Sequence, residues 1–186
     1  MTTAAEAGGG PSPGLARLWA GWRSGYIAQV GDDAAALRPD QTGRSLFERI
    51  LQSGRPDEET LVVHRGRLCS AVLNAFPYGS GHLLVLPNRA VAALGGLTTE
   101  EAGELWAMVT AAVHAVEVAY RPDGVNVGAN LGAAAGAGVP DHLHVHVLPR
   151  WAADSNFMTA VAETRVLPEP LAESWRKLSA AWPASG

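Results

Sequence analysis

Apolar and polar positions along the chain follow a helical period most clearly between Thr98 and Tyr120. Apolar side chains there recur every three or four residues, which places them on one face of a helix. Thr98 and Glu101, three residues apart, have the pattern of a capping box, and Pro122 ends the helix. Shorter helices are expected over residues 15–27, 45–51 and 169–182.

Short apolar runs bounded by turn residues predict the strands. Two runs joined at Arg65-Gly66-Arg67 have the form of a tight hairpin, and a third run ends at Pro87. Because the strands surround one long helix without regular alternation of strand and helix, we expect an α+β fold with an antiparallel five-stranded sheet. The five expected strands span residues 61–64, 68–74, 82–87, 125–130 and 141–149.

Composition indicates one globular domain and disfavours several classes of partner. The chain has 186 residues, of which 47% are hydrophobic, so it can bury one core. Its net charge of -4 disfavours nucleic acid as a partner. The single cysteine, Cys69, excludes an internal disulfide and suits a reducing cytoplasm. No segment approaches the roughly 20 apolar residues of a membrane span. We therefore expect a cytoplasmic protein, with a disordered tail at residues 1–13 and one domain over 14–186.

Three histidines alternate with apolar residues in the run His142-Leu143-His144-Val145-His146. In a strand, alternate side chains point to the same face, so the imidazoles would follow one another at steps of roughly 6.6 Å. Imidazole is a nucleophile, a general acid or a metal ligand near neutral pH. The pattern alone therefore leaves covalent catalysis and zinc binding open, with Asp141 beside it to orient a ligand.

The histidine run resembles the defining motif of the histidine-triad family, and four further pieces stand in the family's order. The resemblance covers about residues 45–150 and is most similar to the actinobacterial branch of diadenosine tetraphosphate phosphorylases or hydrolases, through Leu18-Trp19, Tyr26 and residues 151–157. The four pieces are Asn74 with Pro77 and Gly81-His82, the stretch Gly124 to Gly132 containing Asn130, the pair Ala135-Gly136, and Pro149-Arg150.

The resemblance implies a covalent mechanism without cofactor or metal. In the family the middle histidine, here His144, attacks the α-phosphate of a nucleotide and forms a nucleotidyl-histidine. Its neighbours His142 and His146 are expected to hold its tautomer and bind phosphate oxygens, and His146 also to donate to the leaving group. The expected nucleotide-binding residues are Asn74, His82, Asn130, Gly136 and Gly138, the glycines supplying positive φ or close approach of the backbone.

The same resemblance implies the partners. We expect a small-molecule nucleotide substrate, adenylylated through a polyphosphate, phosphoramidate or sulfate group. We also expect a homodimer whose sheet continues across both subunits. The domain core would be residues 45–150, and the C-terminal segment 151–186 would pack near the site.

Two segments depart from the family's pattern. Where many relatives carry a pair of cysteines for structural zinc, this chain has Ser45-Leu46-Phe47-Glu48, so that zinc site is not expected. Where other relatives place Gln before the triad to contact the leaving phosphate, this chain has Ala137-Gly138. Leaving-group recognition therefore passes to other groups, for which the candidates are Arg150, Asn156 and the C-terminal segment of the other subunit.

The sequence leaves three functions to weigh. The first is a nucleotidyl hydrolase or transferase whose acceptor is water, orthophosphate or an amine. The second is a metalloenzyme with His142, His144 and His146 as zinc ligands. The third is a nucleotide-binding sensor with little turnover.

Overall fold

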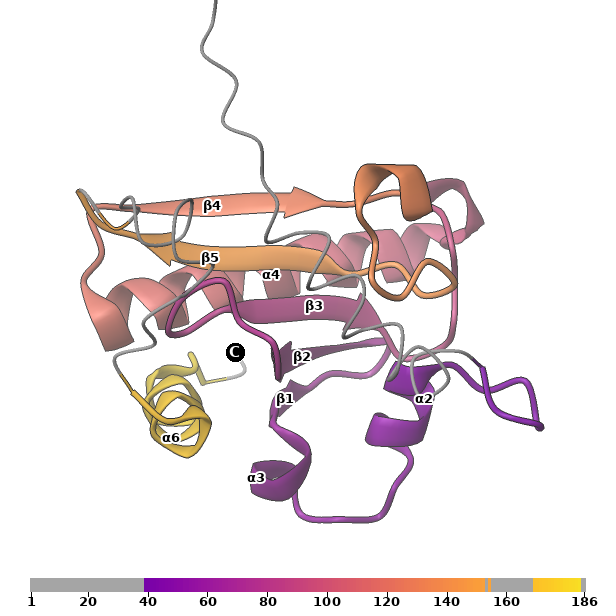
Figure 1. The fold of residues 1–186 in the computed structure, drawn as a ribbon, viewed down its shortest axis with the longest axis horizontal. Helices are drawn as coiled ribbons and strands as arrows, with labels where there is room; N and C mark the ends of the chain where they lie inside the picture. The colour runs from indigo at the N-terminus through magenta and orange to yellow at the C-terminus, as the bar shows by residue number, and fades with distance from the viewer. Residues whose placement is uncertain (1–38, 153, 155–168, 185–186) are drawn as a thin grey trace, which may run out of the picture.

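Five strands form one antiparallel sheet in the computed structural model, which describes residues 39–152, 154 and 169–184 (Figure 1). The expected α+β fold with five antiparallel strands is confirmed. The expected tail at 1–13 and helix at 15–27 lie outside the described residues, as does Asn156. The strands are β1 (Val62–Arg65), β2 (Cys69–Leu73), β3 (Leu83–Pro87), β4 (Gly124–Ala129) and β5 (Val145–Arg150). The helices are α2 (Leu46–Leu51), α3 (Asp57–Thr60), α4 (Thr99–Tyr120) and α6 (Leu171–Ala181), with 3-10 turns η1 (Leu94–Gly96) and η2 (Ala133–Ala135).

The order of strands in the sheet is β1-β2-β3-β5-β4, and each strand is antiparallel to its neighbours. The last strand in the sequence therefore inserts between β3 and β4 (Figure 1). This insertion brings the histidine run next to the end of β3. Strand β4 is left at an edge, where nearly all its side chains are exposed.

Each face of the sheet has its own apolar cluster. On one face, α4 and α6 pack against alternate residues of the central strands, including Leu143, Val145 and Val147. Figure 1 shows α4 lying against the sheet, nearly parallel to the axes of β3 and β5. On the other face, Phe47 of α2 packs with a smaller cluster that includes Leu84. Strands β2 and β3 are buried along their whole length because both faces are covered in their part of the sheet.

Two helices begin with the same arrangement of side chain and backbone. The capping box expected at Thr98 is confirmed: its hydroxyl accepts from the Glu101 amide at 3.2 Å, and Glu101 accepts from the Thr98 amide. Ser45 and Glu48 form an equivalent box at the start of α2, again with a 3.2 Å bond to the hydroxyl. Each box satisfies two backbone N–H groups that the first turn leaves without a helical partner.

The position of α6 shows which face of the sheet this part of the C-terminal segment covers. Its Leu178 is fully buried in the cluster that contains Leu143 and Val145. The side chains of the alternating histidines lie on the other face. Residues 153 and 155–168 lie outside the described residues, so the expectation that the C-terminal segment packs near the site stays a prediction. Within the described ranges, no helix combines the length and apolarity that crossing a membrane requires.

Candidate active site

The three histidines keep their alternation, although the expected strand over 141–149 begins later than predicted. Strand β5 starts at Val145, so His142 and His144 precede it and only His146 lies within it. Leu143 and Val145 nevertheless point into the main cluster. The histidine rings point to the opposite face, where His142 and His144 lie 5.3 and 5.4 Å from the ring of Phe47.

Both ring nitrogens of His142 are held by the protein. Its Nε2 lies 2.8 Å from the carbonyl oxygen of Pro87, which only accepts, so Nε2 carries the proton. Its Nδ1 therefore accepts from the hydroxyl of Ser45 at 2.6 Å. Burial lowers the pKa of His142 and favours this neutral form. Both nitrogens of the His142 ring therefore have protein partners, and neither is left over for a phosphate oxygen in this arrangement.

His144 is held in one tautomer by the backbone. Its Nδ1 lies 2.8 Å from the carbonyl oxygen of His142, so Nδ1 donates and Nε2 keeps its lone pair. The side chain is 6% exposed, and burial lowers its pKa, which keeps the ring neutral near pH 7. A neutral imidazole with a lone pair on Nε2 is the form of histidine that attacks phosphorus.

His146 presents the opposite tautomer because of His82. The backbone amide of Tyr78 donates to Nδ1 of His82 at 3.0 Å, so the proton of His82 is on Nε2. That Nε2 donates to Nδ1 of His146 at 2.9 Å, which leaves the His146 proton on its own Nε2. This Nε2–H has no acceptor among the described protein atoms. Burial, followed by the neighbouring His144, lowers the pKa of His146 to about 4.

A hollow of about 290 Å³ adjoins the ring of His146. Tyr78 stacks on His146 with ring centroids 5.8 Å apart and forms part of the wall. Asn126 and Asn130 come from β4 and the residue after it, and Asn126 accepts from Arg150 at 2.8 Å. The full lining is Tyr78, Asn126, Val127, Gly128, Ala129, Asn130, His146 and Leu148.

The expected nucleotide-binding residues divide into two groups. Asn130 lines the hollow beside His146. The buried His82 instead contacts His146, and the side-chain amide of Asn74 lies 3.3 Å from the same His82 ring. Gly136 has the expected positive φ, at 91°, whereas Gly138 does not. Neither glycine belongs to the lining of this hollow.

A zinc ion does not fit the donor atoms of the histidine run. A catalytic zinc site needs three protein ligands whose lone pairs converge. The nitrogens of His142 are taken by Ser45 and Pro87, and Nδ1 of His144 donates to a carbonyl. Across the part of the chain that the structure describes, no group of three or more His, Cys, Asp or Glu side chains is placed to hold a metal ion.

Sequence reasoning missed several residues that contact the histidines: Phe47, Pro87, Ser45 and Tyr78. Ser45 lies 97 positions before His142, and no local pattern links them. Tyr78 lies between Pro77 and Gly81 and carries no pattern of its own, yet its ring stacks on His146 and its amide donates to His82. A second hollow of about 340 Å³, over α2, is lined by residues such as Leu46, Arg49 and Ile50 and contains none of the expected site residues.

The sheet and its histidines define an α+β protein with a buried cluster of neutral imidazoles beside an open hollow. The chain belongs to the HIT domain family, whose family model matches residues 55–153. A relative named AP-4-A phosphorylase, from Mycobacterium tuberculosis, is 42% identical over 95% of this chain and 89% of the relative. A bis(5'-nucleosyl)-tetraphosphatase from Schizosaccharomyces pombe is 39% identical over half of each chain.

Solved structures agree with this assignment. A Hit-like protein from Bartonella henselae has a TM-score of 0.60 and 26% identity, covering 73% of this chain and 94% of its own. A zinc-bound histidine triad family protein from Mycobacterium smegmatis has a TM-score of 0.59, also at 26% identity, over 73% and 91% of the two chains. The chain is accordingly an enzyme of the histidine-triad kind, which transfers or hydrolyses nucleotidyl groups.

Proposed function

We propose that the protein cleaves dinucleoside polyphosphates through a covalent nucleotidyl intermediate on Nε2 of His144. The observation that carries this proposal is the 2.8 Å contact between Nδ1 of His144 and the carbonyl of His142, which leaves the Nε2 lone pair available. In the first step Nε2 forms a bond to the α-phosphorus, and the bond from that phosphorus to the bridging oxygen breaks. The remaining polyphosphate leaves with that oxygen.

The proton on Nε2 of His146 serves the leaving oxygen. The centroid of the His146 ring lies 5.0 Å from that of the His144 ring. The Nε2–H group of His146 has no acceptor among the described protein atoms. His146 donates this proton as the bridging oxygen departs and takes a proton back from the acceptor in the second step. Asn130, in the wall of the same hollow, supplies an amide to the phosphate oxygens.

Orthophosphate is the acceptor we propose, with diadenosine tetraphosphate as substrate. An oxygen of orthophosphate attacks the α-phosphorus, the nitrogen–phosphorus bond breaks, and the products are ADP and ATP. The AP-4-A phosphorylase from M. tuberculosis, similar over nearly the whole chain, supports this choice. The S. pombe tetraphosphatase is similar over only half of the chain and makes water the second candidate, with AMP and ATP as products.

Radiolabelled orthophosphate distinguishes these acceptors. The protein is incubated with diadenosine tetraphosphate and labelled orthophosphate, and the nucleotides are separated. We expect the label in ADP, and His144→Asn to lower turnover by at least about a thousandfold. The matched control is His114→Asn, at an exposed position on α4, which leaves turnover unchanged. Unlabelled AMP as the product would show that the reaction is hydrolysis and not phosphorolysis. Full turnover in His144→Asn would refute the covalent mechanism.

We further propose that two subunits associate through the edge strand β4. Within the described residues nothing covers this strand: Val127 is 43% exposed, and Trp106 of α4 is 53% exposed. An edge strand with apolar side chains is a template for pairing, and pairing with a second β4 would continue the sheet under two-fold symmetry. Light scattering after size exclusion should give twice the chain mass, and Val127→Lys should lower it; a monomeric wild type contradicts this arrangement.

We infer a reducing compartment such as the cytoplasm from the one cysteine. Cys69 is fully buried, and burial raises the pKa of its thiol to about 12, so it is a packing residue with no disulfide partner in the sequence. Fractionation of cells that express the native chain tests this location; recovery in a secreted fraction contradicts it.

A further inference from the structure

The segment that carries His142 and His144 is held by side chains as well as by the sheet. Pairing between β3 and β5 begins at the pair Val85 and Val145, so the preceding histidines have no ladder position. The amide of Leu143 donates to the carbonyl of Val91 at 2.6 Å. The carbonyl of His142 is used by the His144 ring instead of by a strand. The direction of this carbonyl is therefore set by the Leu143 amide, which belongs to the same planar peptide unit, together with the groups that hold the ring of His142.

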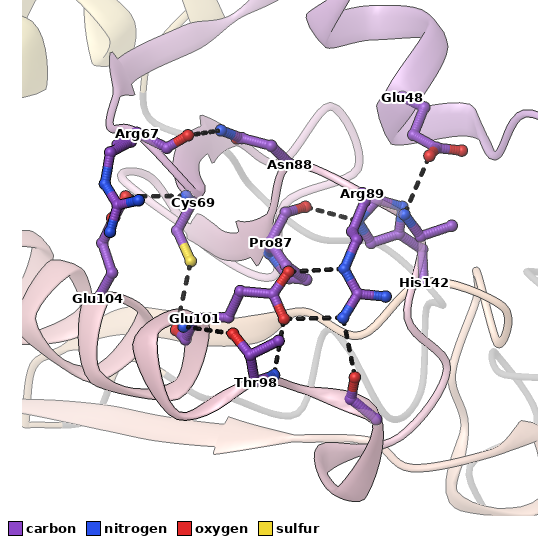
Figure 2. A network of polar contacts seen from close by, with 12 residues as sticks. Glu48, Arg67, Cys69, Pro87, Asn88, Arg89, Thr98, Glu101, Glu104 and His142 are labelled. Atoms are coloured by element: carbon purple, nitrogen blue, oxygen red, sulfur yellow. Dashed lines mark hydrogen bonds and ion pairs between the residues drawn. The ribbon is translucent and has the colours of Figure 1, made fainter.

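Four residues from two separate segments hold the His142 ring, and we call them the His142 clamp: Ser45, Glu48, Pro87 and Ala90. The Ser45 hydroxyl donates to Nδ1, and the Pro87 carbonyl accepts from Nε2. Glu48 joins the two segments, since one carboxylate oxygen accepts from the Ala90 amide at 3.0 Å and the other from the Ser45 amide at 2.9 Å. Figure 2 shows the His142 ring between Pro87 and the residues near Glu48.

The hydroxyl of Ser45 has its single proton committed to His142. It accepts from the Glu48 amide at 3.2 Å and donates its single proton to Nδ1 of His142. Ser45 is 1% exposed and His142 is fully buried. Loss of the hydroxyl would leave Nδ1 of His142 as a buried acceptor without its donor, which releases one end of the ring.

We propose that Ser45 is a positioning residue for the nucleophile, acting through His142. By fixing the ring of His142, it aims the carbonyl of that residue at Nδ1 of His144 and so maintains the tautomer with a lone pair on Nε2. Ser45 itself contacts no reacting atom. The inference deepens the proposed function and rests on it for its kinetic consequence, whereas its effect on the tautomer stands by itself.

The chain offers a matched pair of variants to test this role. Ser45→Gly and Thr98→Gly each remove the hydroxyl of a capping box, and glycine is an acceptable first residue of a helix, so the loss of capping is small and similar in both. Only Ser45→Gly also leaves the buried Nδ1 of His142 without its donor. Thr98 bonds to Glu101, which pairs with Arg89, and its described hydrogen bonds reach no histidine (Figure 2). Ser45→Thr restores a hydroxyl at the first position.

We expect Ser45→Gly to lower kcat by roughly tenfold, the equivalent of one ordinary hydrogen bond, with KM within about twofold because the substrate does not touch Ser45. Thr98→Gly should keep both constants within about twofold, and Ser45→Thr should recover most of kcat. Long-range proton–nitrogen NMR should show His144 protonated only on Nδ1 in the wild type and in Thr98→Gly, but on either nitrogen in Ser45→Gly.

Two outcomes would overturn the proposal: equal kcat in the two glycine variants, or an unchanged His144 tautomer in Ser45→Gly. The adduct on His144 keeps this test separate from that of the proposed function. If the wild type forms no nucleotidyl-histidine with labelled substrate, the proposed mechanism fails, and the NMR measurement still decides the role of Ser45.

Discussion

Nε2 of His82 lies 2.9 Å from Nδ1 of His146, and this contact decides which nitrogen of His146 carries the proton. Because the Tyr78 amide donates to the other nitrogen of His82, the direction of the bond is fixed from the backbone outward. The resemblance to relatives had placed His82 against the nucleotide. In the structure it contacts His146, and so it sets the tautomer of the proton donor that we propose.

Replacement of His82 should therefore reduce the chemical step. In His82→Ala the Nδ1 of His146 loses its donor, the proton is shared between its two nitrogens, and we expect kcat to fall by roughly tenfold to a hundredfold. His82→Gln keeps an N–H donor on a side chain of similar reach and should lose less. Steady-state kinetics with diadenosine tetraphosphate measure both variants; equal losses in the two would show that the hydrogen bond to His146 is not what matters.

The buried histidines should make the fold sensitive to mild acid. Unfolded histidine takes a proton near its ordinary pKa of 6.5, whereas folded His146 does so only near about 4. Between these values the unfolded chain binds more protons, so the free energy of unfolding falls as the pH drops from about 6.5 towards 4. Burial lowers the pKa of His142 and His144 as well, and their contributions have the same sign.

Urea unfolding at about pH 7 and about pH 5 measures this loss, and His146→Gln should show a smaller difference between the two. The ion pair between Glu101 and Arg89 responds to a lower range of pH than the histidines do. Arg89 holds the pKa of Glu101 at about 2, below its ordinary 4.5, so the stability from Glu101 is lost only below that ordinary value. A free energy of unfolding that is flat between pH 7 and 5 would contradict the neutral state of the histidines.

Gly81, directly before His82, should tolerate no side chain. Its φ of 74° is left-handed, and an added Cβ would lie 2.5 Å from Cε2 of Tyr120. Gly54 has a similar φ of 69° but nothing within 4 Å, so Gly54→Ala isolates the backbone effect. We expect Gly54→Ala to cost about 1 kcal/mol of stability and Gly81→Ala about 3 kcal/mol, since overlap with the ring adds to the backbone strain. Equal losses in chemical denaturation would show that the Tyr120 ring moves aside freely.

Adjacent glutamates at the start of α4 should differ in their importance to stability. Glu101 is 5% exposed and accepts from Arg89 through both carboxylate oxygens, at 2.6 and 2.8 Å (Figure 2). Glu100 pairs with Arg67, but both side chains are about 70% exposed. We expect Glu101→Ala to cost about 2 kcal/mol and Glu100→Ala at most about 0.5 kcal/mol. Thermal unfolding of the two variants measures the difference, and a larger loss in Glu100→Ala would contradict it.

Local patterns in the sequence predicted most of the described elements. The Thr98 and Glu101 pattern gave the start of α4, and alternation gave the face on which each histidine lies. The predicted start of β5 was wrong, because alternation shows to which side each side chain points and not whether the backbone pairs with a neighbouring strand. Strand β3 ends at Pro87, which has no N–H to donate, and its carbonyl bonds the His142 ring.

The sequence predicted those parts of the candidate site that lie within a single motif. His144 and His146 follow from the run itself, whereas their tautomers depend on a backbone carbonyl and on His82, 64 positions earlier. The role of Ser45 depends on strand order, because β5 must insert beside β3 before α2 can meet His142. Contacts of this kind have no local sequence pattern.

The hydrogen bond between the His144 ring and the carbonyl of His142 joins two residues of one short segment. A dipole that is already oriented when substrate arrives needs no reorganisation during the reaction, and preorganisation of this kind is a large part of enzymatic rate enhancement. Folding itself, then, would perform the activation of the nucleophile that we propose. Substrate has only to bring its phosphorus within reach.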